Sequence, residues 1–170
     1  LMSEAMHLLL KFNDNIYNVN TIAEHKRVLQ NQGSVIWGLI KPDPDSKSIA
    51  LQKQQQLIEQ IRDGIPTYAF LASHGKITHK ATVTQLYSNE AVMSRQHLVP
   101  EYYRKDLARC VLGFEFSSII EMDSNESAQI KRYGGGELAL SNQTNPLYAS
   151  YSIMPSDHSQ LPLLTPERKM

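Results

Sequence analysis

The chain has 170 residues, and its 17 lysines and arginines balance its 17 aspartates and glutamates. This length suits one domain with its own core, and the zero net charge argues against a generic polyanion binder, although a local basic patch is still compatible with it. The apolar stretches are too short to span a membrane, no signal-peptide pattern is present, and Cys110 is the single cysteine, so we expect a cytoplasmic protein without disulfides or membrane contact.

The first predicted elements are a strand, a loop and a helix. Residues 6–12 form a short apolar run typical of a buried strand, and the asparagine-rich residues 13–20 predict a loop. The spacing of Thr21 and Glu24 matches a capping box, in which the Thr21 hydroxyl accepts the amide N–H of Glu24. We therefore expect a helix that begins at Thr21 and is closed by Gly33 in a left-handed conformation.

A second strand and a second helix follow. The β-branched and aromatic residues 34–41 predict a strand that contains Trp37, the only tryptophan of the chain. The prolines and aspartates after it predict a turn, and Asp45 or Ser46 is then expected to cap a helix that reaches Asp63. The core-facing side of this helix is predicted to consist of Ala50, Leu57, Ile58 and Ile61.

The next part of the chain predicts mainly strands. Residues 67–73 and 76–87 flank His74-Gly75 and together predict a β-hairpin. A helical turn is expected over residues 100–106. Residues 109–122 carry the clearest strand pattern in the second half of the chain.

The C-terminal part predicts less regular structure. Ser124 is expected to cap a short helix to about Lys131, and residues 134–136 predict a glycine loop. We divide the chain into a domain over residues 1–154 and a loosely ordered tail over residues 155–170. The order of elements predicts an α+β fold with a curved mixed or antiparallel sheet, or a small β-barrel, flanked by helices.

Motifs of catalysis and metal binding are missing from the sequence. There is no phosphate loop, dinucleotide fingerprint or serine elbow, and no two of the six histidines have the helical spacing of a metal site. Asp43 and Asp45 lie among prolines, where turn formation explains them better than metal binding. Cys110 lies within a predicted strand and is expected in the core. The sequence therefore favours a binding protein over an enzyme and predicts no cofactor or metal.

Several stretches carry a resemblance to a known family. They are Leu8–Phe12, Val35–Gly38, the hairpin Tyr68–Ile77 and its continuation Ala81–Val83. In this order, and followed by the strand over 109–122, they resemble the PUA-like superfamily, in particular its YTH and EVE branches, over roughly two thirds of the chain. The sequence departs from those branches at His79 and Lys80, which replace a hairpin glycine, and in having one tryptophan.

The resemblance implies a non-catalytic domain that accepts a flipped, modified base, such as a methylated one, from DNA or RNA. In bacteria such domains are specificity parts of modification-dependent restriction systems or stand-alone proteins. A flipped base loses its stacking neighbours, and stacking on an aromatic side chain is worth about 1–3 kcal/mol per base. The implied partners are DNA or RNA with a modified base and an effector subunit or domain.

The resemblance also implies a base pocket around Trp37. In this pocket Tyr17 is expected to close over the base, and Ser34 and Asn15 are expected to hydrogen-bond to its edge. The residues expected to contact phosphates are Lys41, Lys76, Lys80 and Arg95. The alternative for Trp37 is a place in the core, since the sole tryptophan of an apolar strand is often buried. The alternative function is a small-molecule- or protein-binding domain of a larger effector on the same fold.

Overall fold

The computed structural model describes residues 4–41, 49–138, 140 and 147–152, and a mixed β-sheet is its central feature. The strands are β1 (His7–Lys11), β2 (Val35–Ile40), β3 (Tyr68–Ser73), β4 (Lys76–Ser88), β5 (Cys110–Glu121), β6 (Ile130–Arg132) and β7 (Leu147–Tyr151). They lie in the order β2-β5-β4-β3-β1-β7-β6. Only β1 and β3 pair in parallel, and β2 and β6 are the edges among the described strands. The predicted α+β class with a curved mixed sheet is confirmed, and the sheet is not closed into a barrel.

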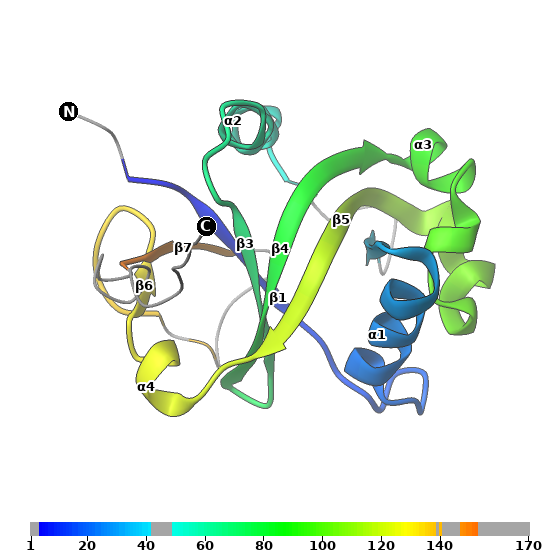
Figure 1. The fold of residues 1–170 in the computed structure, drawn as a ribbon, viewed down its shortest axis with the longest axis horizontal. Helices are drawn as coiled ribbons and strands as arrows, with labels where there is room; N and C mark the ends of the chain where they lie inside the picture. Colours follow the sequence, from blue (N-terminus) through cyan, green and yellow to red (C-terminus); the bar gives the residue numbers. More distant parts are fainter. Residues whose placement is uncertain (1–3, 42–48, 139, 141–146, 153–170) are drawn as a thin grey trace, which may run out of the picture.

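Helices surround this sheet. They are α1 (Thr21–Gln32), α2 (Leu51–Arg62), α3 (Asn89–Met93), α4 (Ser124–Ser127) and the 3-10 helices η1 (Gln96–Leu98) and η2 (Glu101–Arg109). The long strands β4 and β5 run side by side through the middle of the molecule, with α1 and α3 towards one end and α4, β6 and β7 towards the other (Figure 1). In the part of the chain that the structure describes, no helix has the length and apolarity to cross a membrane.

The predicted hairpin and the predicted left-handed Gly33 are present. His74 and Gly75 form the turn between β3 and β4, with φ angles of 53° and 75°. Gly33 closes α1 with φ 86°, and its N–H donates to the carbonyl of Leu29. These features depend on local backbone chemistry, because few residues other than glycine, asparagine or histidine adopt positive φ at low cost.

Two predicted helix caps are wrong by one residue. Asn20 caps α1, because its Oδ1 accepts the Ala23 N–H at 2.9 Å, and Thr21 is already helical. Asp123 caps α4, and its Oδ1 accepts the Glu126 N–H at 2.8 Å. Asparagine and aspartate are at least as good at this position as the neighbouring threonine or serine. The helix expected to reach Lys131 ends at Ser127, since the chain then enters β6.

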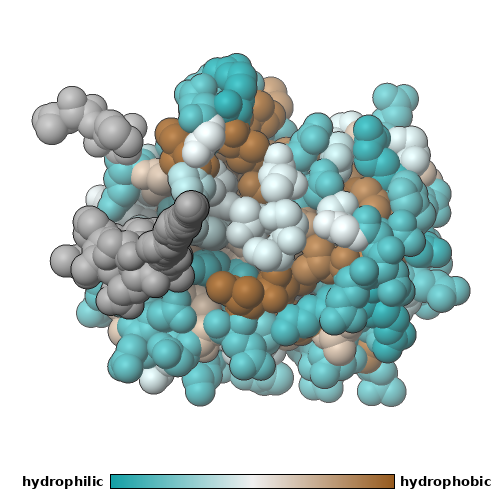
Figure 2. Space-filling view, in the orientation of Figure 1, coloured by the Kyte–Doolittle hydropathy of each residue, from teal (hydrophilic) through white to brown (hydrophobic). Residues whose placement is uncertain are grey.

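The second helix differs from its prediction at its start and on its faces. It begins at Leu51 after Ala50, which makes no side-chain cap; Asp45, Ser46 and the aspartate at 43 lie outside the described residues. Leu57 is buried as predicted, but Ala50 and Ile58 are exposed. In Figure 2, apolar surface lies next to α2, where Leu51 is 80% and Ile58 40% exposed.

A buried glutamine takes the place expected for an apolar side chain of α2. Gln60 Oε1 accepts the Met6 N–H at 2.7 Å, and its Nε2 donates to the Met6 carbonyl at 2.9 Å and to Thr67 Oγ1 at 3.2 Å. All of its hydrogen-bonding groups are therefore satisfied, which is the condition for burying an amide. Gln60 fixes α2 to the residues that precede β1 and β3.

Both faces of the sheet carry cores. One contains Trp37 together with Leu8, Leu10, Phe114 and Phe116. At the β2–β5 end, Cys110 is a core residue, as expected, and packs with Ile36, Tyr87, Val92, Tyr103 and Leu107. Asn89 Nδ2 donates to the carbonyls of Leu107 and Cys110 at 2.9 and 2.8 Å, which fixes the end of η2 to β5. The predicted domain boundary at residue 154 and the predicted tail 155–170 lie outside the described residues.

Candidate functional site

A cavity of about 210 Å³ lies where the end of β1, the start of α1, the strand β2 and the helix η2 meet. We call it the aromatic cavity, because the rings that line it are Phe12, Tyr17, His25, Trp37, Tyr102 and Tyr103. Thr21, Gly38 and Ile40 are among the other lining residues. Residues between positions 11 and 103, from four segments of the chain, therefore contribute to one site.

Trp37 and His25 form a stacked ring pair in the aromatic cavity. Their rings stack at a centroid distance of 4.4 Å and an interplanar angle of 30°. The His25 Nδ1–H donates to the carbonyl of Thr21 at 2.8 Å, since a carbonyl can only accept. Burial lowers the pKa of His25 to about 4, so this imidazole is neutral at pH 7. The ring pair is thus an uncharged aromatic surface.

Tyr103 closes the cavity against the edge of the sheet. Its hydroxyl accepts the Gly38 N–H at 2.9 Å, donates to the Ile36 carbonyl at 3.2 Å and lies 3.4 Å from His25 Nε2. Burial raises the pKa of Tyr103 well above 10, so the hydroxyl keeps its proton. Because β2 is an edge among the described strands, its outward backbone groups need such a partner.

Tyr17 and Tyr102 form the outer part of the aromatic cavity. Their rings meet edge to face at 5.2 Å. The Tyr17 hydroxyl donates to Asp106 Oδ2 at 2.6 Å, and Asp106 also pairs with Arg109 at 3.3 Å. Burial and this hydrogen bond raise the pKa of Tyr17 to about 12. The contact ties the loop after β1 to η2 and holds the Tyr17 ring in place.

One lysine lines the aromatic cavity, and a second follows one of its lining residues in the chain. Lys11 lines it directly, and Lys41 follows Ile40, which lines it as well. The backbone of Lys41 is fixed, because its N–H donates to the Arg109 carbonyl at 2.9 Å and its own carbonyl accepts from the Arg109 guanidinium at 3.0 Å. Within the described ranges, no group of three or more His, Cys, Asp or Glu side chains is placed to hold a metal ion.

The structure brings together two of the four residues predicted for a base pocket. Trp37 and Tyr17 both line the aromatic cavity, and Trp37 is at the same time a core residue that is only 6% exposed. Ser34 lies half-buried before β2 and does not line the cavity. Asn15 is exposed in the loop after β1, where its backbone N–H donates to Asn13 Oδ1 at 2.9 Å, and it does not line the cavity either.

The four predicted phosphate contacts are spread over the molecule. Lys41 directly follows Ile40, which lines the aromatic cavity, and Lys76 is exposed next to the β3–β4 turn. The Lys80 ammonium lies 4.9 Å and 5.2 Å from the ring centres of Tyr68 and Tyr151. The Arg95 guanidinium lies 4.6 Å from the ring centre of Tyr87 and donates to the Ala91 carbonyl at 3.0 Å. Neither Lys80 nor Arg95 lines the aromatic cavity.

Four of the six rings that line the aromatic cavity were not predicted from the sequence, and Phe12 was expected only as part of the first strand. His25, Tyr102 and Tyr103 were expected only as parts of helical segments. The adjacent tyrosines in a short helical turn were the one available signal, because paired aromatic residues in a polar segment require a place to pack. The position of His25 under Trp37 has no counterpart in the sequence pattern.

Comparison with known proteins assigns the family. A family model described as Pua-like matches residues 8–150, which is well over half of the chain and includes the whole aromatic cavity. No curated protein and no solved structure gives a match. PUA-like domains generally bind nucleic acid, including RNA. The match and the open mixed sheet with its flanking helices agree, and the chain belongs to the PUA-like family.

Proposed function

We propose that this domain binds DNA or RNA without catalysis and takes one flipped, modified base, such as a methylated one, into the aromatic cavity. The observation that carries the proposal is an open pocket of about 210 Å³ that has six aromatic rings in its lining. Pockets for drug-sized ligands measure about 300–1,000 Å³, so a space of this size suits one planar base rather than a larger molecule.

The chemistry of the cavity supports a base over a phosphate. His25 and Tyr103 are both neutral at pH 7, because burial lowers the pKa of the first and raises the pKa of the second. Stacking of a flipped base on a neutral aromatic lining contributes about 1–3 kcal/mol and offsets the stacking that the base loses when it leaves the strand. A methyl group on the base adds about 0.8 kcal/mol when it is buried in such a lining.

The charged groups outside the cavity support contacts to the nucleic-acid backbone. Lys11 lines the cavity and Lys41 follows the lining residue Ile40, and we expect their ammonium groups to contact the phosphates on either side of a flipped nucleotide. Because the net charge of the chain is zero, we expect few phosphate contacts and a shallow dependence of affinity on salt. The resemblance of Val35–Gly38 and the β3–β4 hairpin to YTH and EVE domains supports a modified base and an effector partner.

Fluorescence of Trp37 tests the proposal directly. Trp37 is the only tryptophan, so all tryptophan emission comes from a residue that lines the aromatic cavity. We would titrate the protein with short single strands of DNA and RNA that contain N6-methyladenine, 5-methylcytosine, 5-hydroxymethylcytosine or only ordinary bases. A modified strand is expected to quench the emission at lower concentration than its unmodified counterpart.

Tyr17→Ala is the most informative variant, because Tyr17 lines the cavity and is half-buried at the edge of a core cluster rather than inside it. We expect about tenfold weaker binding, which corresponds to about 1.4 kcal/mol of lost stacking. Tyr133→Ala is the matched control, since Tyr133 is also half-buried, has one side-chain hydrogen bond, to Gln56, and does not line the cavity.

Three results would change the proposal. Equal affinity for modified and ordinary strands would support nucleic-acid binding but contradict a preference for a modified base. Unchanged binding by the Tyr17→Ala variant would contradict the aromatic cavity as the binding site. Absence of binding to every strand would overturn the proposal and favour a small-molecule- or protein-binding domain of a larger effector.

A further inference from the structure

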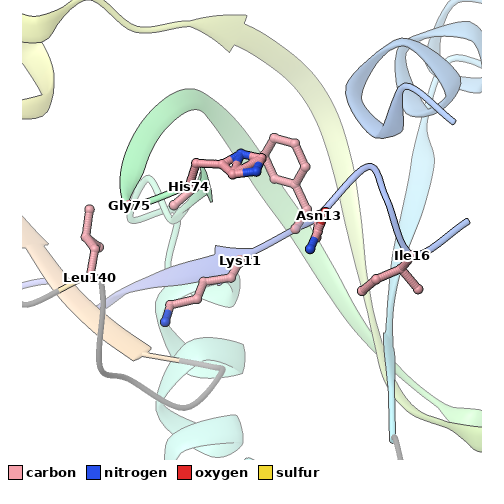
Figure 3. A pocket seen from close by; sticks show the side chains of 8 residues that line it. Lys11, Asn13, Ile16, His74, Gly75 and Leu140 are labelled. Atoms are coloured by element: carbon pink, nitrogen blue, oxygen red, sulfur yellow. The ribbon is translucent and has the colours of Figure 1, made fainter. Parts of the chain in front are cut away.

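A second cavity of about 280 Å³ lies directly beside the aromatic cavity. The two share four lining residues, which are Lys11, Phe12, Asn13 and Ile16. On its other side the second cavity is lined by Ala72, His74, Gly75 and Leu140. Figure 3 shows His74 and Asn13 on one side of this space and Lys11 on the other, with Leu140 and Ile16 at its two ends. One loop, from the end of β1, thus separates two neighbouring cavities.

We propose that the second cavity receives the base of the nucleotide next to the flipped one, and that Ile16 is a wedge between the two bases. This inference rests on the proposed function of the aromatic cavity. It assigns a second nucleotide subsite, so that the domain holds two consecutive, unstacked bases rather than one.

The exposure of Ile16 is the first observation that carries this assignment. Its side chain is 71% exposed although it is large and apolar, and it lines both cavities. Proteins that unstack nucleic acids insert isoleucine, leucine or phenylalanine between adjacent bases. An exposed isoleucine on the wall between two base-sized spaces has the position and the chemistry of such a wedge.

The ring of His74 is the second observation. His74 lies exposed at the tip of the β3–β4 hairpin with φ 53°, and its Nδ1 is 3.2 Å from Ser73 Oγ. With the half-buried Phe12 it places two flat rings on one cavity. Bases stack on histidine and phenylalanine, and this recognition tolerates different base identities.

The groups around the shared wall suit the phosphate that links the two nucleotides. Lys11 lines both cavities, and Lys76 follows the His74-Gly75 turn. The Asn13 side chain is also shared. A phosphodiester that passes over this wall would meet a cation and an amide, which are common contacts to the nucleic-acid backbone.

The test uses nine-nucleotide single strands with a central N6-methyladenine or 5-methylcytosine. Each is made intact and with an abasic nucleotide immediately before or after the modified base. An abasic nucleotide on one of the two sides is expected to weaken binding by about 5- to 100-fold, the equivalent of one stacked base, and on the other side to have little effect.

Two variants probe the protein side of the same contact. His74→Asn removes the ring but keeps a residue that accepts a positive φ, and Ile16→Ser removes an exposed side chain, so both should fold. Each is expected to weaken binding of the intact strand at least fivefold, and His74→Asn should have little further effect on the sensitive abasic strand. His97→Asn, at an exposed histidine outside both cavities, should bind like the original protein.

The outcomes separate this inference from the proposed function. If Tyr17→Ala weakens binding but the abasic strands, His74→Asn and Ile16→Ser do not, the second subsite is wrong and the aromatic cavity stands. If His74→Asn and Ile16→Ser each weaken binding of the intact and the abasic strands equally, stacking in the second cavity is wrong. If no modified strand binds, both proposals are overturned.

Discussion

The Tyr103 hydroxyl accepts the amide N–H of Gly38 at 2.9 Å and in this way replaces a neighbouring strand at the outer edge of β2. The missing Cβ of Gly38 permits this approach, because a Cβ there would lie 3.1 Å from Tyr103 Cε2 and 3.3 Å from Cys110 Sγ. One glycine in an edge strand therefore decides how closely η2 can pack and where one wall of the aromatic cavity lies.

Gly38→Ala is expected to push the Tyr103 ring outwards by a few tenths of an ångström and to change the shape of the aromatic cavity. We expect a loss of about 1–3 kcal/mol in the free energy of unfolding, from overpacking, and weaker binding of modified strands. Urea unfolding and Trp37 fluorescence titration measure the two effects.

Gly113→Ala is the comparison for this prediction. A Cβ at Gly113 would meet Val92 Cγ2 at 2.6 Å and Ile36 Cγ2 at 2.9 Å, and Gly113 does not line the cavity. It should lose more stability than Gly38→Ala, but any folded protein should keep its affinity. A reversed order of the two affinities would contradict the role given to Tyr103.

Tyr103→Phe is expected to destabilise the fold while leaving an aromatic ring in the cavity. It removes the acceptor of the Gly38 N–H and the donor to the Ile36 carbonyl, and an unsatisfied buried group costs about 1–3 kcal/mol. Chemical unfolding measures this loss. Tyr133→Phe, whose hydroxyl accepts from Gln56 in a half-buried contact, should lose less; equal losses would mean that the β2 edge does not depend on Tyr103.

Acid is expected to destabilise the protein through two buried histidines. Burial is the main reason that the pKa values of His7 and His25 fall from 6.5 to about 4. Between these values the unfolded chain binds protons that the folded protein does not, so stability is full above pH 6.5 and decreases as the pH falls towards 4. Each histidine contributes up to about 1.4 kcal/mol per pH unit.

Urea unfolding at several pH values between 7 and 4 measures this slope. His7→Gln and His25→Gln should each make the slope shallower, whatever their effect on stability at pH 7. His97→Gln, at an exposed histidine, should leave the slope as it was. A steep slope that survives both substitutions would assign the acid sensitivity to other groups.

Gln60→Leu is expected to be strongly destabilising although it replaces a polar side chain with an apolar one in the core. The change leaves the N–H and the carbonyl of Met6 without their side-chain partner, at about 1–3 kcal/mol for each buried group. Thermal unfolding measures the loss. Gln55→Leu on the exposed side of the same helix should change stability little, and a similar loss in both variants would argue against the Met6 contacts.

The sequence alone determined the features that depend on neighbouring residues. The strand with Trp37, the His74-Gly75 hairpin and the left-handed Gly33 follow from β-branched runs and from the few residue types that accept positive φ. The caps at Asn20 and Asp123 were misplaced by one residue, because two adjacent residues can each cap and the backbone path into the helix selects between them.

Contacts between distant segments determined that β7 is a strand and that Gln60 is a core residue, which the sequence pattern did not show. β7 is a strand because it lies against β1 and β6, and its own composition has no clear strand pattern. Gln60 belongs to the core because Met6 and Thr67, at the starts of two other strands, meet it there. Contacts of this kind depend on the completed fold rather than on local propensity.

The sequence by itself determined that Trp37 lies on a strand and that Tyr17 lies in the loop after the first strand. The family resemblance implied that both residues belong to one base pocket. Only the tertiary structure brought His25, Tyr102 and Tyr103 to the same place. The hydrogen bond between Gly38 and Tyr103 joins residues 65 positions apart, and no spacing along the chain encodes it. The aromatic cavity exists because α1 and η2 pack around one open edge of the sheet, which needs cover for its backbone groups.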